Sequence, residues 1–544
     1  MAGSSEVSSA RRRGYSVAFG LAKAVLLALA AIGLMGLVAC ISSTPTPAAT
    51  STPVQGLPSS SATLAATAAP HQDVHQEATD ALLSQGSGIA YSRLLRLRSG
   101  PDVRLPSLEV ECDLCARWEH PDPLTYVFYL RQGVRWQNIE PVKGRELTAR
   151  DVAYSLDRLR TPGWPGASLL QAVDSVKATG SYTVNIKLRY PDADFLLALA
   201  DGQAKIVAPE AVKVHGDLLQ GPTIGTGPWI LKQVASDGLM FEANPSYYEP
   251  GLPKLQGLKV VPISDPTTRL AAVLAGQADL ASVSIEEWDR AIAFQSRINI
   301  GAFPQPGTGV LFGLKAGAAP FDAVDVRRTA FQSLDPWSAL DKVWKGSGDA
   351  GVGIPVPSDW LLPQDEMRRF LGNGAQTDVA LPLAHSVSVN LKVADYGNRY
   401  LALGQEYRRM LEAAGFQVTV DEVNPRVYAE DVWGKGDFQA FLGPMPPVHS
   451  SNDFLLSVLH SQGRWAITGY ADQELDRLIQ AQSVTEQGRG EIVLDIQRRV
   501  LDNAVMFMPV TGTSLWVWQK RVEGFAPNFA ASEYFHWARI SVRQ

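Results

Sequence analysis

Strand-like and helix-like patterns of apolar residues follow one another along most of the chain. Residues 124–131 and 181–188 alternate apolar and polar side chains, which predicts two half-buried strands. Between them, residues 152–159 follow Thr148 and Asp151, a variant of the capping box, which predicts a helix. Strands interleaved with helices in this way predict an α/β fold.

The second half of the chain carries the same alternation. Residues 310–314 and 438–442 are continuous apolar runs and predict buried strands. A strand at 387–393, a helix at 400–415 and a strand at 416–420 are spaced as in a βαβ unit. The chain of 544 residues is too long for one ordinary core, because domains run to roughly 100–200 residues, so we expect two or three domains.

The most ordered set of signals lies in residues 221–280. A Gly-Thr-Gly-Pro turn and a strand beginning at Trp229 come first, followed by an Asn-Pro-Ser-Tyr-Tyr turn and a second strand. Asp265 can then cap a helix that has Pro266 in its first position and ends at Gly276. A Gly-Gln-Ala-Asp sequence leads from there into the next strand.

This ordered set resembles the extracytoplasmic solute-binding proteins of ABC transporters, in the family that contains oligopeptide-, dipeptide- and nickel-binding proteins. The blocks at 131–152 and 320–335 resemble the same family, and the resemblance covers about residues 76–544. It implies a two-lobed periplasmic-binding-protein-like fold of the class II type, with an extra subdomain in lobe one. It places lobe one at 76–282 and 512–544 and lobe two at 283–511, with ligand between the lobes and a hinge motion that closes them.

The N-terminus has the features of an export signal. Arg11, Arg12, Arg13 and Lys23 precede an uncharged apolar run that ends in Leu-Val-Ala-Cys at Cys40. We interpret residues 1–39 as a lipoprotein signal peptide with Cys40 as the lipidated residue. The alternative is an uncleaved transmembrane anchor, although the run is slightly short for a span of ~20 residues. Export through the general or the twin-arginine route is left open.

Residues 40–75 are predicted to be a disordered tether of Ser, Thr, Pro and Ala. The uncharged stretch 42–70 contains too little apolar surface to build a core, and such a segment would hold the folded part away from the membrane. The formal net charge is −6, with no long Lys/Arg run beyond the N-terminus, which argues against binding nucleic acid.

Cys112 and Cys115 form a C-x-x-C pair. The pattern is compatible with a redox motif, half a zinc site or a local disulfide. No second C-x-x-C is present, and the oxidising compartment favours either a structural disulfide or two buried thiols.

The resemblance suggests where ligand would bind. Tyr91, Trp433, Met445 and Thr513 are our candidates for the cleft, each with a packing role as the alternative. In the peptide binders an acidic residue after the strand matching 438–442 accepts the ligand's ammonium group, and the loop 443–448 has none here. We therefore expect a less charged ligand, such as a modified peptide, a sugar or an apolar small molecule.

Nickel is the other ligand of the family. His71 and His75 are spaced for one helical face but fall at the end of the predicted tether, and the other histidines are scattered. No metal site, cofactor or catalytic residue is therefore predicted.

We interpret the chain as a membrane-tethered receptor, outside the cytoplasm, that delivers a small peptide-like or other organic ligand to an ABC importer. Its partners would be separately encoded permease and ATPase subunits, because the chain lacks a phosphate-binding loop, and we expect a monomer. One alternative is a degenerate binding domain that acts as a sensor or scaffold. The other is an extracytoplasmic hydrolase, for which neither G-x-S-x-G nor H-E-x-x-H is present.

Overall fold

A computed structural model describes residues 60–372, 385–446, 448 and 450–543. The predicted signal peptide, Cys40 and the first part of the predicted tether lie outside the described residues. Within the described part, no helix combines the length and the apolar character needed to cross a bilayer.

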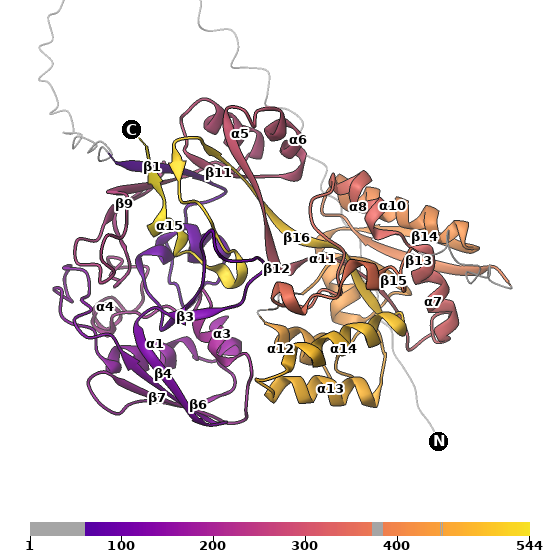
Figure 1. The fold of residues 1–544 in the computed structure, drawn as a ribbon, viewed down its shortest axis with the longest axis horizontal. Helices are drawn as coiled ribbons and strands as arrows, with labels where there is room; N and C mark the ends of the chain where they lie inside the picture. Colours follow the sequence, from indigo (N-terminus) through magenta and orange to yellow (C-terminus); the bar gives the residue numbers. More distant parts are fainter. Residues whose placement is uncertain (1–59, 373–384, 447, 449, 544) are drawn as a thin grey trace, which may run out of the picture. The chain divides into compact units, whose positions relative to one another are not determined.

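One mixed sheet runs through the described residues in the order β14-β13-β15-β12-β16-β11-β1-β10-β9-β8. The half from β11 to β8 belongs to lobe one, the half from β15 to β14 belongs to lobe two, and β12 and β16 run through both (Figure 1). The strands are β1 (Ser61–Ala66), β8 (Trp229–Ala235), β9 (Gly238–Ala243), β10 (Gly257–Pro262), β11 (Leu280–Val283), β12 (Ile298–Leu314), β13 (Val387–Ala394), β14 (Phe416–Val423), β15 (Ala440–Pro444) and β16 (Met506–Gln519).

Strand β1 corrects the predicted tether, which placed residues up to 75 outside the fold. Ser61–Ala66 pairs in parallel with β10 on one side and β11 on the other. Ala62, Leu64, Ala65 and Ala66 are completely buried. Small side chains that resemble a linker in sequence here allow neighbouring layers to pack closely on both faces of the sheet.

Lobe one contains a second, four-stranded sheet in the order β4-β5-β7-β6. The predicted alternation places Tyr126, Phe128 and Leu130 of β5 in the core, where helix α1 covers them. Thr148 donates its backbone N–H to Asp151 at the start of α1, as the capping pattern predicts. This sheet is the extra subdomain, built from β4 (Cys115–Asp122), β5 (Thr125–Leu130), β6 (Val173–Ala178), β7 (Thr183–Leu188) and α1 (Ala149–Leu159).

Lobe two is organised around the predicted βαβ unit. Strands β13 and β14 are parallel, and α10 (Asn398–Ala413) connects them. The core beneath is aromatic, with Phe312, Phe331, Tyr407 and Phe507 in mutual contact. The other helices of lobe two are α7 (Val324–Ser333), α8 (Pro336–Trp344), α9 (Gln364–Met367), α11 (Pro425–Tyr428), α12 (Ser451–Phe454), α13 (Gln473–Val484) and α14 (Arg489–Asp502).

The chain passes between the lobes within β12 and β16. The predicted boundaries at 282/283 and 511/512 bracket crossings that occur at residues 304–309 of β12 and at Gly512 of β16. Helix α6 (Ile285–Ala293) still packs on the core of lobe one through Trp288 and Ala291. The remaining elements of lobe one are α2 (Gly166–Leu169), α3 (Phe195–Ala200), α4 (Pro209–His215), α5 (Pro266–Leu274), α15 (His536–Arg539), β2 (Leu95–Leu97), β3 (Val110–Cys112), β17 (Val522–Glu523) and β18 (Ser541–Val542).

The segment around Tyr91 differs from the expected opening helix. It forms a five-residue π-helical turn at Ala81–Gln85 and a 3-10 turn at Ser87–Ala90. A Cβ added at Gly86 or Gly88 would come within 3.0 Å of backbone atoms of the preceding turn. The two glycines therefore permit a compact fold-back where a regular helix would continue.

Candidate functional site

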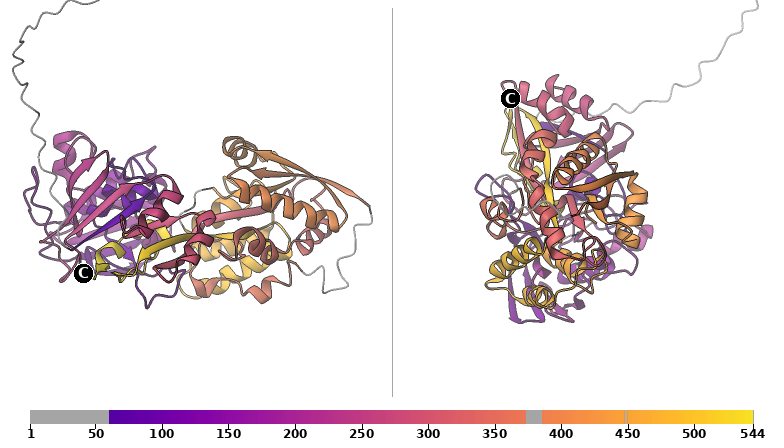
Figure 2. Two further views of the ribbon diagram at one scale, coloured as in Figure 1. Left: turned by 90° about the horizontal axis from the view of Figure 1, so that it is seen from above. Right: turned by 90° about the vertical axis from the view of Figure 1, so that its right-hand side faces the viewer.

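The connection between the lobes contains a break in the strand pairing. Residues 298–304 of β12 pair with 513–519 of β16, and pairing resumes at Gly309 opposite Thr511. Four residues of β12, 305–308, therefore lie opposite Gly512 alone. Figure 2 shows β16 passing from the half of the sheet in lobe one to the half in lobe two. Such a bulge loosens the ladder locally and gives the two halves of the sheet a place to bend.

Glycine is required at this bulge. Gly309 has a φ of +140°, which L side chains rarely adopt. A Cβ on Gly512 would lie 1.7 Å from the hydroxyl oxygen of Thr308. The hinge is therefore specified by small residues on both strands.

An acidic cavity of about 340 Å³ lies between the lobes. Lobe one contributes Tyr190, Asp192, Asp194 and Asp201, and lobe two contributes Asp453 and Arg464 among others. Its acidic side chains outnumber its single arginine, so it favours a ligand group that is cationic or donates hydrogen bonds.

A mixed-charge cavity of about 530 Å³ also lies between the lobes. Arg104 and Glu109 come from lobe one, while Asp359, Trp360 and Arg489 come from lobe two. A polar solute with an apolar part could contact both charge signs and the indole here.

The two cavities share a wall made by Asp194 and Arg489. Arg489 Nη1 lies 2.5 Å from Asp194 Oδ1, and the two side chains are 6% and 9% exposed. Asn452 donates its backbone N–H to the other oxygen of Asp194 at 2.7 Å. Burial alone would raise the pKa of Asp194, but Arg489 and the donated hydrogen bonds hold it below its usual value. The wall is therefore an ion pair with Asp194 charged.

Asp192 stands beside this ion pair and has the opposite electrostatic character. Its burial, followed by the nearby charge of Asp194, raises its pKa above the usual value. It accepts a hydrogen bond from the Asn452 side chain at 2.7 Å. Asp192 therefore gains a proton more readily than an ordinary aspartate.

A third cavity, of about 420 Å³, lies at the hinge and includes Thr513. Trp344, Tyr396 and Tyr400 line it from lobe two. Of the four predicted cleft residues, Thr513 is the one whose side chain faces a cavity described here. Its contact with ligand stays a prediction.

Trp433 and Met445 lie together in lobe two. The indole N–H of Trp433 donates to the carbonyl of Pro444 at 3.2 Å, and both side chains pack half-buried against the core of lobe two. The nearby loop touches the hinge, because a Cβ on Gly307 would lie 3.1 Å from the carbonyl oxygen of Val448. Both residues occupy the packing role that we gave as the alternative, and their role in binding stays a prediction.

Tyr91 is buried in lobe one, with 2% of its surface exposed. Burial raises the pKa of its hydroxyl well above the usual value. Its carbonyl accepts a hydrogen bond from the Tyr534 hydroxyl at 2.9 Å. In this structure Tyr91 is a core residue that ties the C-terminal segment to lobe one.

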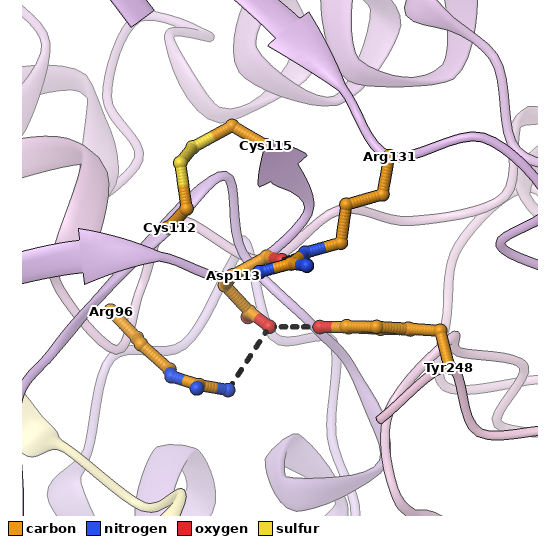
Figure 3. The surroundings of a disulfide bond; sticks show 6 residues. All are labelled: Arg96, Cys112, Asp113, Cys115, Arg131 and Tyr248. Atoms are coloured by element: carbon orange, nitrogen blue, oxygen red, sulfur yellow. Dashed lines mark hydrogen bonds and ion pairs between the residues drawn. A yellow bond between two sulfur atoms is a disulfide. The ribbon is translucent and has the colours of Figure 1, made fainter. Parts of the chain in front are cut away.

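Cys112 and Cys115 are joined in a disulfide, with Cα atoms 5.0 Å apart. Asp113, inside the closed loop, points to Arg96 and to the Tyr248 hydroxyl, and Arg131 donates to its carbonyl at 2.8 Å (Figure 3). The loop therefore presents a buried carboxylate to two surrounding segments of lobe one.

The two predicted tether histidines lie within the folded part. His75 is 1% exposed and its Nε2 donates to the Lys205 carbonyl at 2.9 Å, which requires that nitrogen to carry a proton. His71 bonds to the Thr223 hydroxyl at 3.0 Å. Among the described residues, no group of three or more His, Cys, Asp or Glu side chains is arranged to hold a metal ion.

Sequence reasoning missed the residues that form the wall. Asp194 and Arg489 are 295 positions apart, and each has ordinary local surroundings in the sequence. The available signal was weak: a Pro-Asp-Ala-Asp turn before one helix and an arginine at the start of another. Neither pattern specifies its partner.

Comparison with known proteins agrees with this architecture. The family model described as "Bacterial extracellular solute-binding proteins, family 5 Middle" matches residues 109–466. The chain is 24% identical over 464 residues to the probable D,D-dipeptide-binding periplasmic protein DdpA of Escherichia coli, covering 82% of this chain and 87% of that protein. It is 26% identical over 309 residues to heme-binding protein A of Haemophilus influenzae, covering 52% and 53% of the two chains.

Solved structures share the fold. HbpA2 from Haemophilus parasuis superposes with a TM-score of 0.74 at 19% identity, covering 89% of this chain and all of that one. DppA from Helicobacter pylori, in complex with the peptide STSA, gives a TM-score of 0.64 at 18% identity, covering 89% and 98%. The predicted two-lobed α/β fold is confirmed. The family match spans most of the chain, and the protein belongs to the bacterial extracellular solute-binding proteins of family 5.

Proposed function

We propose that this chain is a membrane-tethered receptor that captures a small peptide-like or other organic ligand between its lobes and delivers it to an ABC importer. The observation that carries the proposal is the pair of cavities bounded by both lobes, next to a sheet whose pairing breaks at the crossing strands. A hinge beside a two-sided cavity suits a protein that encloses a solute and releases it unchanged.

Two features bear on the chemistry of the ligand. The described part of the loop 443–448 contributes no carboxylate, which supports a ligand without a free terminal amine at that position. The acidic cavity supports a ligand with a cationic or hydrogen-bond-donating group elsewhere. A blocked peptide with a basic side chain would satisfy both features.

The membrane and protein partners follow from the N-terminus and the family. Lipidation at Cys40 would anchor the receptor to the outer face of the cell membrane, where a permease and its ATPases would receive the ligand. We propose a monomer that performs no chemical step on its ligand.

Ligand-dependent thermal unfolding tests this function. The full chain in detergent micelles is screened against free peptides, N-acetylated peptides, sugars and nickel chelates. A ligand at one hundred times its dissociation constant stabilises the folded state by about 2.7 kcal/mol and raises the unfolding temperature. A screen in which none of these classes raises it contradicts the proposal.

A matched pair of variants locates the site. Asp453→Asn changes a residue of the acidic cavity, whereas Asp237→Asn changes an exposed aspartate on the hairpin of β8 and β9. A ligand held in the acidic cavity loses affinity in the first variant and keeps it in the second.

A further inference from the structure

The turn at residues 191–194 of lobe one makes a buried polar contact with lobe two. Arg489 pairs with Asp194, Asn452 donates to Asp194 and to Asp192, and the backbone N–H of Ala193 donates to the Ser483 carbonyl at 2.9 Å. We propose that this contact is a latch that holds the two lobes together in the absence of ligand. The inference rests on the proposed receptor function and concerns its empty state.

The lobe-two side of the latch is built without help from lobe one. Arg489 donates from Nε to Gln482 at 3.0 Å and from Nη2 to the side-chain oxygen of Asn452 at 3.0 Å. Gln482 donates to the same Asn452 oxygen at 2.9 Å. These bonds fix the guanidinium with one nitrogen directed at Asp194, so the binding geometry exists before the lobes meet.

The lobe-one side is also preorganised. The backbone N–H of Asp194 donates to Asp192 Oδ1 at 3.0 Å, which folds the turn on itself. Helix α3 follows directly, and its first residue, Phe195, is buried in the lobe-one core. Both halves of the latch can therefore separate and meet again as rigid units.

The energetics of the contact suit a reversible latch. An ion pair removed from water gains little net free energy, because the desolvation of both charges offsets most of their attraction. The acidic cavity borders Asp194 on one side, and the mixed-charge cavity borders Asp194 and Arg489 on the other. A small opening of the lobes would let water reach both charges, which lowers the cost of separation.

The latch needs no ligand to be satisfied. Arg489 supplies the positive charge that Asp194 requires, and Asn452 supplies a second hydrogen bond. Residues 304–309 of β12 provide the bend at which the lobes would part when the contact breaks. The empty receptor would therefore alternate between a latched and an unlatched state, and the ion pair sets the balance.

Single-molecule fluorescence transfer on the ligand-free full chain tests the latch. Dyes are placed on cysteines introduced at the exposed positions Val234 of lobe one and Ala402 of lobe two. Arg489→Gln and Asp194→Asn are each expected to increase the unlatched population at least threefold. The double variant should add little to either single variant, because the interaction is already lost.

A buried pair inside lobe one provides the control. Arg158 and Asp73 are an ion pair with side chains 8% and 5% exposed, similar to the latch pair. Asp73→Asn should lower the unfolding temperature and leave the distance between the dyes unchanged. Asn452→Ala, which removes the side-chain bond to Asp192, tests the latch if the charge variants fold poorly.

The outcomes separate the latch from the receptor function. Unchanged dye distances in correctly folded Asp194, Arg489 and Asn452 variants overturn the latch, as does an equal change in Asp73→Asn. Ligand binding is measured separately by thermal unfolding. A receptor that binds ligand but shows no change in these variants retains its function and has no latch.

Discussion

Two buried arginine–carboxylate pairs in this protein have the same chemistry and different surroundings. Arg93 and Glu533 lie inside lobe one, with both carboxylate oxygens 2.8 Å from Arg93 Nη2. Arg489 and Asp194 lie between the lobes, 2.5 Å apart. Both pairs are nearly excluded from solvent, so burial and distance alone do not distinguish a structural ion pair from a movable one.

The surroundings of Glu533 bind it into one folded unit. It also accepts hydrogen bonds from the backbone of Leu97, Tyr534 and Phe535. Burial would raise its pKa, but Arg93 and these donors keep the pKa below the usual value. Breaking this pair would require the C-terminal segment to leave the core of lobe one. Breaking the Asp194 pair requires a hinge to bend, so position in the architecture decides the role.

Glu533→Gln should have the largest effect on this comparison. It leaves the Arg93 guanidinium charged and buried without a counter-ion, which costs about 3–5 kcal/mol of unfolding free energy. Urea unfolding followed by circular dichroism measures the loss. Glu119→Gln is the surface control, because its pair with Arg117 is exposed and contributes at most about 1 kcal/mol. Equal losses in the two variants would contradict the structural role of Glu533.

Acidification should weaken lobe one through His75. Burial, followed by the charge of Arg158, lowers the pKa of His75 from 6.5 to about 4. Between these pH values the unfolded chain binds a proton that the folded protein does not, so stability is lost as the pH falls from 6.5 to 4. The steepest loss is about 1.4 kcal/mol per pH unit.

His75→Gln isolates this contribution. Its amide can still donate to the Lys205 carbonyl, but it does not titrate. Unfolding free energies measured from pH 7 to 4 should fall less steeply in the variant. His536, whose pKa is lowered to about 3, contributes equally to both proteins and cancels in the difference. Parallel pH profiles would contradict the assignment.

Removal of the disulfide should have the smallest of the three effects. Replacing Cys112 and Cys115 by alanine frees a four-residue loop, which by the chain-entropy relation costs about 2 kcal/mol. The same change loosens Asp113 in lobe one and should leave the distance between the lobes unchanged. Calorimetry of the double variant measures the cost, and a change in the dye distance between the lobes would blur the comparison that we draw.

The sequence anticipated elements whose causes are local. The capping pattern at Thr148 and Asp151 starts α1, and Asp265 accepts from the backbone of Thr268 at the start of α5. The apolar runs at 310–314 and 438–442 become buried parts of β12 and β15. These signals succeed because the residues that specify an element lie within a few positions of one another.

What the sequence determined by itself was the order of strands and helices, and through that order the family and the two-lobed fold. The tertiary structure decided which small residues near the N-terminus enter the sheet as β1, that Cys112 bonds to Cys115, and that Asp194 meets Arg489. The physical reason is that backbone periodicity and caps are short-range properties. Partners across a sheet or between lobes are chosen by the packing of the whole chain.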